Sequence, residues 1–138
     1  MRYFTLLLLA ALLFGCQPDE TTLVEPDCTE GATLSGDADV DRQVLEQLEA
    51  EILQLVDREC SNGKKCRTIG FGAKPCGGPW SYLIYSSSST DEDLLIEKVC
   101  AYNAYQDAMN QHYGYFSDCA VEEVPQLQCS GGKCAFVL

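Results

Sequence analysis

Cysteine is the residue type whose number and spacing carry the clearest chemistry in this chain of 138 residues. The chain has nine cysteines and one histidine, and no two cysteines are separated by only two residues. Structural zinc sites combine closely spaced cysteine pairs, or cysteines with histidines. The pattern therefore disfavours a metal site, and we expect the thiols to be used in other ways.

The first cysteine follows an apolar leader. Residues 1–3 carry one positive charge, residues 4–14 are almost wholly apolar, and the leader ends in Leu13-Phe14-Gly15-Cys16. Such a run makes roughly 16 Å of helix, about half of a hydrocarbon core, so it favours a signal peptide over a membrane span. The closing tetrapeptide resembles the lipobox of bacterial lipoproteins. This resemblance implies cleavage after residue 15 and attachment of lipid, including palmitate, to Cys16.

The remaining cysteines predict a disulfide framework. Assigning Cys16 to lipid leaves an even set of eight, in a chain that the leader would direct to an oxidising compartment. The turn sequence SGGK between two of them predicts a local Cys129–Cys134 disulfide, and Cys60–Cys66 is a second local alternative. The candidates are Cys28, Cys60, Cys66, Cys76, Cys100, Cys119, Cys129 and Cys134.

The charge balance limits the classes of ligand. Without Arg2, which leaves with the leader, eight basic residues face 21 acidic ones. An excess of this size argues against nucleic acid and against electrostatic binding of anionic lipid head groups. Five of the basic residues fall within residues 58–74, which we interpret as a solvated charged face, with a dipolar surface for a partner as the alternative.

Three aspartates have the spacing that opens a calcium-binding loop, namely Asp37, Asp39 and Asp41. However, Arg42 stands where such a loop needs glycine, and Leu48 stands where it needs a bidentate glutamate. Carboxylates at these positions are better explained by capping of a helix N-terminus. We therefore expect no metal and no other cofactor.

A minimal hydrolase is the enzymatic alternative. Its residues would be His112, Asp118 and a hydroxyl from the serine run 86–89. Nucleophilic catalysis needs these groups in a defined mutual geometry, and nothing in their spacing along the chain indicates it. We expect a protein that is not an enzyme.

Apolar periodicity predicts the elements that would position these residues. One helix is expected over residues 39–59 and a second from an N-cap at Thr90 to Gly114. Strands are expected over Cys66–Phe71 and Trp80–Ser86, with the latter central, and a closing hairpin over residues 121–137. Together these elements predict a disulfide-rich α+β fold, with two helices packed on a small antiparallel sheet of about four strands. The expected division is a signal peptide (1–15), a lipid-anchored tether (16–36) and a disulfide-stabilised domain (37–138).

The segment 69–86 (IGFGAKPCGGPWSYLIYS) carries a second resemblance. Together with Asn110, the triplet Ser117-Asp118-Cys119 and the closing CSGGKC, it is similar to a group of uncharacterised small bacterial lipoproteins. The resemblance implies a compact domain and no particular activity.

The connection inside this segment is the candidate binding loop. Its two prolines, adjacent glycines and Cys76 predict a rigid loop, which would lose little entropy on binding. We therefore expect a small non-enzymatic binding or structural domain of unknown ligand. The alternative is that the loop only joins two strands while Cys76 compensates for a small core. The loop residues are Lys74, Pro75, Gly77, Gly78, Pro79 and Trp80.

A membrane-anchored protease-inhibitor-like module is the other binding alternative. Lys74 would be its anchor for a trypsin-like pocket, although the following Pro75 disfavours a substrate-like pose. In either case we expect a lipid-anchored protein of the bacterial cell envelope, at the outer membrane. The sequence does not distinguish the periplasmic face of that membrane from the surface face. Its partners would be the membrane, through the anchor, and an envelope or extracellular protein.

Overall fold

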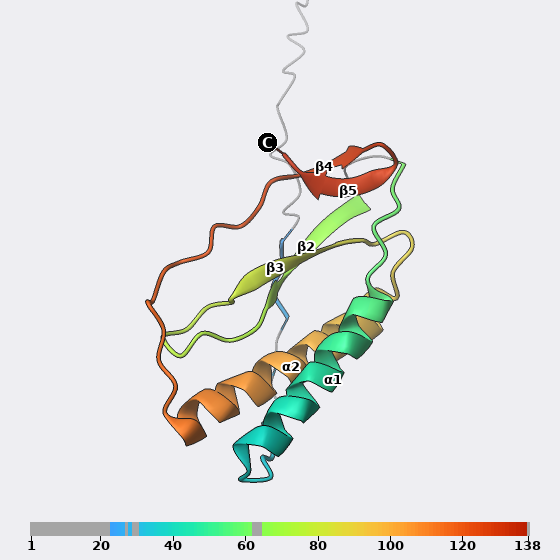
Figure 1. Cartoon of the computed structure of the whole chain (residues 1–138). Helices are drawn as coiled ribbons and strands as arrows, with labels where there is room; N and C mark the ends of the chain where they lie inside the picture. Colours follow the sequence, from blue (N-terminus) through green and yellow to red (C-terminus); the bar gives the residue numbers. More distant parts are fainter. Residues whose placement is uncertain (1–22, 27, 29–30, 62–64, 138) are drawn as a thin grey trace, which may run out of the picture.

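The computed structural model of the chain describes residues 23–26, 28, 31–61 and 65–137 (Figure 1). The expected signal peptide and Cys16 lie outside these residues. The predicted α+β class, with two helices packed on small sheets, is confirmed. In chain order the elements are β1 (Leu23–Val24), α1 (Ala38–Leu55), β2 (Cys66–Phe71), β3 (Ser81–Ser86), α2 (Glu92–Tyr113), β4 (Leu127–Ser130) and β5 (Lys133–Phe136).

The strands form two sheets instead of one. β2 pairs antiparallel with β3, from Cys66 opposite Ser86 to Phe71 opposite Ser81, and β1 lies parallel along the other side of β2. β3 is therefore an edge strand, and the prediction that it is central is wrong. The reason is that β1, which comes from the segment expected to be a tether, takes the place beside β2. The closing hairpin forms a separate two-stranded sheet, which is also joined to the chain before β2 by an isolated antiparallel bridge between Glu59 and Lys133.

The elements stack in layers (Figure 1). α1 and α2 lie side by side against one face of the β1–β3 sheet, and the β4–β5 hairpin lies across the other side of that sheet. The main core fills the space between helices and sheet, and includes the fully buried Ile52, Ile69, Tyr85, Leu95 and Val99. A smaller cluster under the hairpin is made of Cys66, Ile84 and Cys134.

The helix ends follow local capping rules with two corrections. Asp37 caps α1 by accepting hydrogen bonds from the backbone N–H groups of Asp39 and Val40, at 2.9 and 3.2 Å. α1 ends at Leu55, four residues earlier than predicted. It stops there because the backbone of Asp57 is bonded to Thr90.

The second correction concerns α2. Asp91 caps this helix by accepting from the N–H of Leu94. Thr90, the predicted cap, is engaged with Asp57 instead. The predicted end at Gly114 is confirmed, in the left-handed conformation with φ of 67°.

All eight candidate cysteines are paired, as the even count predicts. The pairs are Cys28–Cys100, Cys60–Cys129, Cys66–Cys134 and Cys76–Cys119. The predicted local Cys129–Cys134 and Cys60–Cys66 disulfides are therefore wrong. The cause is tertiary: the cysteines on neighbouring hairpin strands are directed toward the body of the domain, where Cys60 and Cys66 lie.

Among the described residues, no helix combines the length and the apolar character that a bilayer crossing requires.

Candidate functional site

The backbone of the candidate binding loop is held by a stripe of amide side chains on α2. Asn103 accepts a hydrogen bond from the N–H of Gly72 at 2.7 Å and donates to the carbonyl of Gly70 at 3.0 Å. Gln106 accepts from the N–H of Ala73 at 2.7 Å, and Asn110 donates to the carbonyl of Ala73 at 2.8 Å. These amides recur at three- and four-residue steps, so one helix face binds consecutive loop residues. Sequence reasoning missed this role, although the spacing of the three amides was its signal.

Gly72 is required where the loop leaves β2. Its φ is +81°, and an added Cβ would lie 2.8 Å from Oε1 of Gln106 and 2.9 Å from Cδ1 of Trp80. A side chain at this position would meet both the conformational penalty and a steric clash. The loop can therefore approach α2 only because residue 72 has no side chain.

The tip of the loop is a closed turn. The N–H of Lys74 donates to the carbonyl of Gly78, and the N–H of Gly77 donates to the carbonyl of Lys74, both at 2.8 Å. Cys76, within this turn, is joined to Cys119 in the segment that follows α2. The prediction that Cys76 fastens the loop is confirmed, and its partner belongs to a segment more than 40 residues away.

Lys74 is not the exposed anchor that the inhibitor alternative requires. Its side chain is 3% exposed. The ammonium donates to the carbonyl of Ala120 at 2.5 Å, pairs with Glu122 at 3.0 Å and lies 5.2 Å from the centre of the Trp80 ring. Lys74 and the Cys76–Cys119 disulfide therefore both hold the segment after α2 against the loop. The exposed side chain of the loop is that of Trp80.

These clamps complete the wall of an open groove of about 570 Å³. The groove runs between the start of α1, the end of α2, the loop and the segment that follows α2. Its lining residues are Arg42, Leu45, Pro75, Trp80, Gln106, Met109, Asn110, Gly114, Tyr115 and Phe116.

Aromatic side chains form the rim of the groove. Trp80 is 42% exposed, Tyr115 is 44% exposed and Phe116 is 92% exposed. Large aromatic side chains that stay exposed on a small domain are typical of contact surfaces. Arg42 is the cation in the lining, and its side chain pairs with Asp39 at 2.8 Å. Asp39, and then Tyr115, raise the pKa of the Arg42 guanidinium, so this group remains charged.

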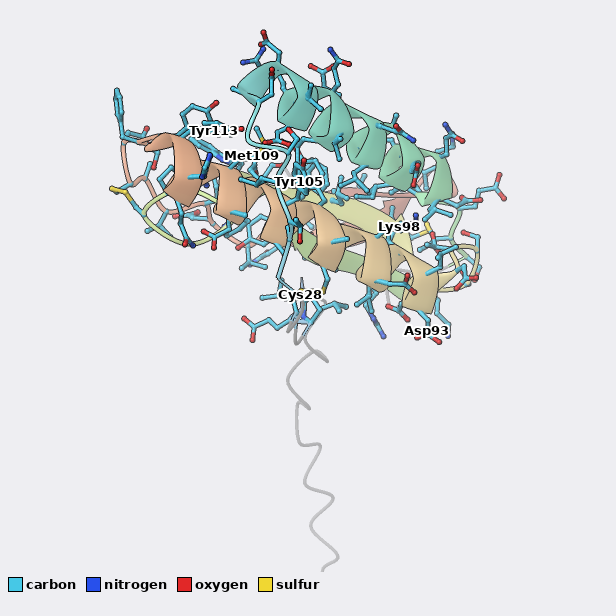
Figure 2. The ribbon with its side chains drawn as sticks, turned by 90° about the horizontal axis from the view of Figure 1, so that it is seen from below. Cys28, Asp93, Lys98, Tyr105, Met109 and Tyr113 are labelled. Atoms are coloured by element: carbon cyan, nitrogen blue, oxygen red, sulfur yellow. A yellow bond between two sulfur atoms is a disulfide. The ribbon has the colours of Figure 1, made fainter. Side chains whose placement is uncertain are left out.

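A buried carboxylate supports the α1 side of the groove. Asp41 is fully buried and accepts hydrogen bonds from the hydroxyls of Tyr105 and Tyr113, at 2.7 and 2.6 Å, and from the N–H of Ser35 at 2.8 Å. Figure 2 shows both tyrosines on the side of α2 that faces α1. Burial acts to raise the pKa of Asp41, but the hydrogen bonds from Tyr113, Ser35 and Tyr105 outweigh it and hold the pKa well below its ordinary value.

The residues of the candidate calcium site and of the candidate hydrolase site do not come together in the structure. Asp37 caps the helix, Asp39 pairs with Arg42 and Asp41 is saturated by donors, so the three aspartates do not converge on a cation. His112 and the serine run 86–89 lie near opposite ends of α2, which at 22 residues is about 33 Å long. The hydroxyl of Ser86, moreover, is buried against Ser88.

One group of metal-ligating atoms is close together in the described part of the chain. The sulfur atoms of Cys60, Cys66 and Cys134 lie within 4.8 Å of one another. All three belong to disulfides in this structure, and metal ligation requires thiolates.

Comparison of the chain with protein-family models, with curated proteins and with solved structures finds no match. The resemblance of segment 69–86 to small bacterial lipoproteins therefore stays a prediction.

Proposed function

We propose that this chain is an exported, lipid-anchored lipoprotein of the bacterial cell envelope, and that its domain binds another protein without catalysing a reaction. The observation that carries the binding proposal is the groove with its rim of Trp80, Tyr115 and Phe116. Exposed aromatic side chains beside a hollow are typical anchors in protein recognition.

The construction of the groove supports a binding role. Its wall is tied by the amide stripe of α2, by the Cys76–Cys119 disulfide and by the buried ammonium of Lys74. Each of these contacts is made before any ligand arrives, so little conformational entropy remains to be lost on binding. The loop therefore does more than join two strands, and its exposed contribution to the surface is Trp80.

The cysteine pattern supports export. If Cys16 carries lipid, eight cysteines remain, and these eight form the four disulfides. Disulfides persist in oxidising compartments outside the cytoplasm. Because β1 and the Cys28–Cys100 disulfide belong to the domain, the tether on this proposal is shorter than the predicted range 16–36. The domain would then stand close to the outer membrane, on its periplasmic or surface face.

The net charge of −12 disfavours nucleic acid as a ligand and so supports an envelope protein or an extracellular protein as the partner. The inhibitor and hydrolase alternatives receive no support from the placement of Lys74 and His112.

Photo-crosslinking tests the groove. A photoreactive residue is placed at Phe116 of the full-length protein in its own cells, and the same residue at Phe136, an exposed phenylalanine on the hairpin, serves as the matched control. We expect a discrete protein adduct from position 116 that Trp80→Ala weakens at least tenfold, and none of that mass from position 136. Equal adducts from both positions, or an adduct insensitive to Trp80→Ala, would contradict the groove as the binding surface.

The anchor is tested separately. Mass spectrometry of the mature chain should show an N-terminal Cys16 carrying lipid, and the protein should partition with the detergent phase. Cys16→Ala should leave the chain unlipidated and water-soluble, with its four disulfides intact. A mature N-terminus elsewhere would overturn the anchor and leave the groove proposal standing.

A further inference from the structure

The two disulfides under the hairpin share one cluster of four sulfur atoms. The sulfurs of Cys60, Cys66 and Cys134 lie within 4.8 Å of one another, and Cys129 is bonded to Cys60. Each disulfide therefore has the other as its neighbour. Thiol–disulfide exchange needs a thiolate close to a disulfide sulfur, and the cluster supplies that proximity as soon as one of its bonds opens.

The register of the hairpin adds a second pairing. Cys129 and Cys134 stand opposite each other on β4 and β5. The N–H of Cys134 points away from β4 and donates to the carbonyl of Arg58 at 2.7 Å, so the two cysteines are a non-hydrogen-bonded pair. In such pairs the Cα atoms are about 4.5 Å apart, which a disulfide can span.

The two disulfides differ in their access to solvent. Cys66 and Cys134 are fully buried, whereas Cys60 and Cys129 are partly exposed. The Cys60–Cys129 disulfide is therefore the one of the two that lies nearer to a thiol in solution. Arg58, whose side chain donates to the carbonyl of Cys134, brings a positive charge beside the cluster, which favours a thiolate there.

We propose that these four cysteines form a disulfide-exchange site, at which a small thiol converts the Cys60–Cys129 and Cys66–Cys134 pairs into Cys60–Cys66 and Cys129–Cys134 and so removes both covalent links between the hairpin and the rest of the domain. The proposal is independent of the groove and of the lipid anchor. It also gives a role to the local pairs that the turn sequences favour.

The exchange has three balanced steps. The external thiolate attacks the sulfur of Cys129, forms a mixed disulfide and expels the Cys60 thiolate. The Cys60 thiolate attacks the sulfur of Cys66 and expels the Cys134 thiolate. The Cys134 thiolate then attacks Cys129 in the mixed disulfide and expels the external thiolate. Two disulfides are broken and two are formed, no electrons are gained or lost, and the external thiol is regenerated.

The product differs in how the hairpin is attached. In the present pairing both hairpin cysteines are covalently bonded to the body of the domain. After exchange their only covalent bond is to each other, and the hairpin is attached by hydrogen bonds such as those of Cys134 with Arg58 and of Gly132 with Cys60. A two-stranded hairpin is marginal in water by itself, and the cluster that it covers is made largely of cystine. Movement of the hairpin would expose Ile84, which is 7% exposed here. The exchange would thus lower the cost of uncovering the outer face of β2 and β3.

Peptide mapping tests the exchange on the full chain. The protein is incubated with a tenth of an equivalent of glutathione, free thiols are then alkylated, and the chain is denatured and digested with trypsin. The native pairing yields Cys66–Arg67 linked to the C-terminal peptide that begins at Cys134. The exchanged pairing yields Cys66–Arg67 linked to the peptide that contains Cys60. We expect the second species to appear without an increase in free thiol.

The chain contains its own control. Cys76 and Cys119 are more exposed than the cluster, but none of the other cysteine sulfurs that the structure describes is grouped with theirs, so an opened bond can only close again. We expect the cluster to form non-native pairs at least ten times faster than this disulfide. Exclusive recovery of the native pairing, or random exchange among all eight cysteines, would overturn the proposal. In the Cys60→Ser/Cys129→Ser variant the remaining Cys66–Cys134 disulfide should resist the same treatment.

Discussion

The hydroxyl of Tyr113, at the end of α2, donates a hydrogen bond of 2.6 Å to the carboxylate of Asp41 in the first turns of α1. Tyr105, two turns earlier in α2, donates to the other oxygen of the same carboxylate. One buried anion thus joins the two helices at the end of the domain where the groove opens. This arrangement determines how stability should depend on pH.

Asp41→Asn is expected to destabilise the domain at neutral pH and to have a smaller effect in acid. The pKa of Asp41 is lowered on folding, so the carboxylate stabilises the folded state fully above its ordinary pKa of 3.8. This contribution decreases as the pH falls below that value and is lost completely only below the lowered pKa of the folded state. Urea denaturation at pH 7 and at pH 3, with disulfides intact, measures the difference. Asp39→Asn, at an exposed position, is the control. A variant effect of equal size at both pH values would contradict the assignment.

Tyrosine titration provides an independent check at alkaline pH. The hydrogen bond to Asp41 raises the pKa of Tyr113 to about 12, whereas the pKa of Tyr102, also about 12, is raised first by burial. Each folded-state pKa exceeds the ordinary value of 10.0, so the stability from these hydroxyls is complete below pH 10 and is lost as the pH rises toward 12. In Asp41→Asn the pKa of Tyr113 should fall and that of Tyr102 should not, as ultraviolet absorbance or NMR can measure. Parallel shifts in both tyrosines would indicate general loosening instead.

Gly72→Ala should cost more stability than Gly77→Ala. Both glycines have positive φ, +81° and +93°, and each alanine would meet a backbone penalty of about 1–3 kcal/mol. Only the Cβ at residue 72 would also meet Gln106 and Trp80, since no described atom lies within 4 Å of the Cβ at residue 77. The free energies of unfolding and the near-ultraviolet circular dichroism of Trp80 report the two effects. Equal losses in both variants would mean that the contact with α2 does not matter.

Lys74→Met should loosen the segment after α2 and weaken the groove. The substitution keeps the apolar stem but removes the ammonium that binds Ala120 and Glu122, at a cost of about 1–3 kcal/mol. Hydrogen exchange over residues 115–122 should become faster. Lys98→Met is the matched control, because Lys98 also pairs with a glutamate, Glu51 at 2.8 Å, but is 33% exposed and should matter less. If exchange over residues 115–122 is unchanged in Lys74→Met, the lysine is not a clamp.

Local patterns determined much of this fold. Strand β2 coincides with the predicted Cys66–Phe71, β3 begins one residue later than predicted, and Gly114 ends the second helix as expected. These features depend on side-chain periodicity and on the dihedral freedom of single residues, both of which a few neighbouring positions decide. The even count of cysteines after Cys16 likewise predicted that all eight would pair. The position of the loop that ends at Trp80 could also be located from Gly, Pro and Cys spacing alone, whereas the exposure of Trp80 is seen only in the structure.

Only the tertiary structure decided which distant residues meet. The cysteines that a turn would join locally are bonded to partners 68 and 69 positions away, because the hairpin lies with its cysteines against the sheet. Lys74 and Asp41 look like surface charges in the sequence, and each is buried with hydrogen-bonding partners on another element. Burial and pairing depend on how layers pack, and packing is a property of the whole chain that no short window of residues contains. The groove exists for the same reason, since its walls come from two helix ends, a loop and the segment that the Cys76–Cys119 disulfide holds against that loop.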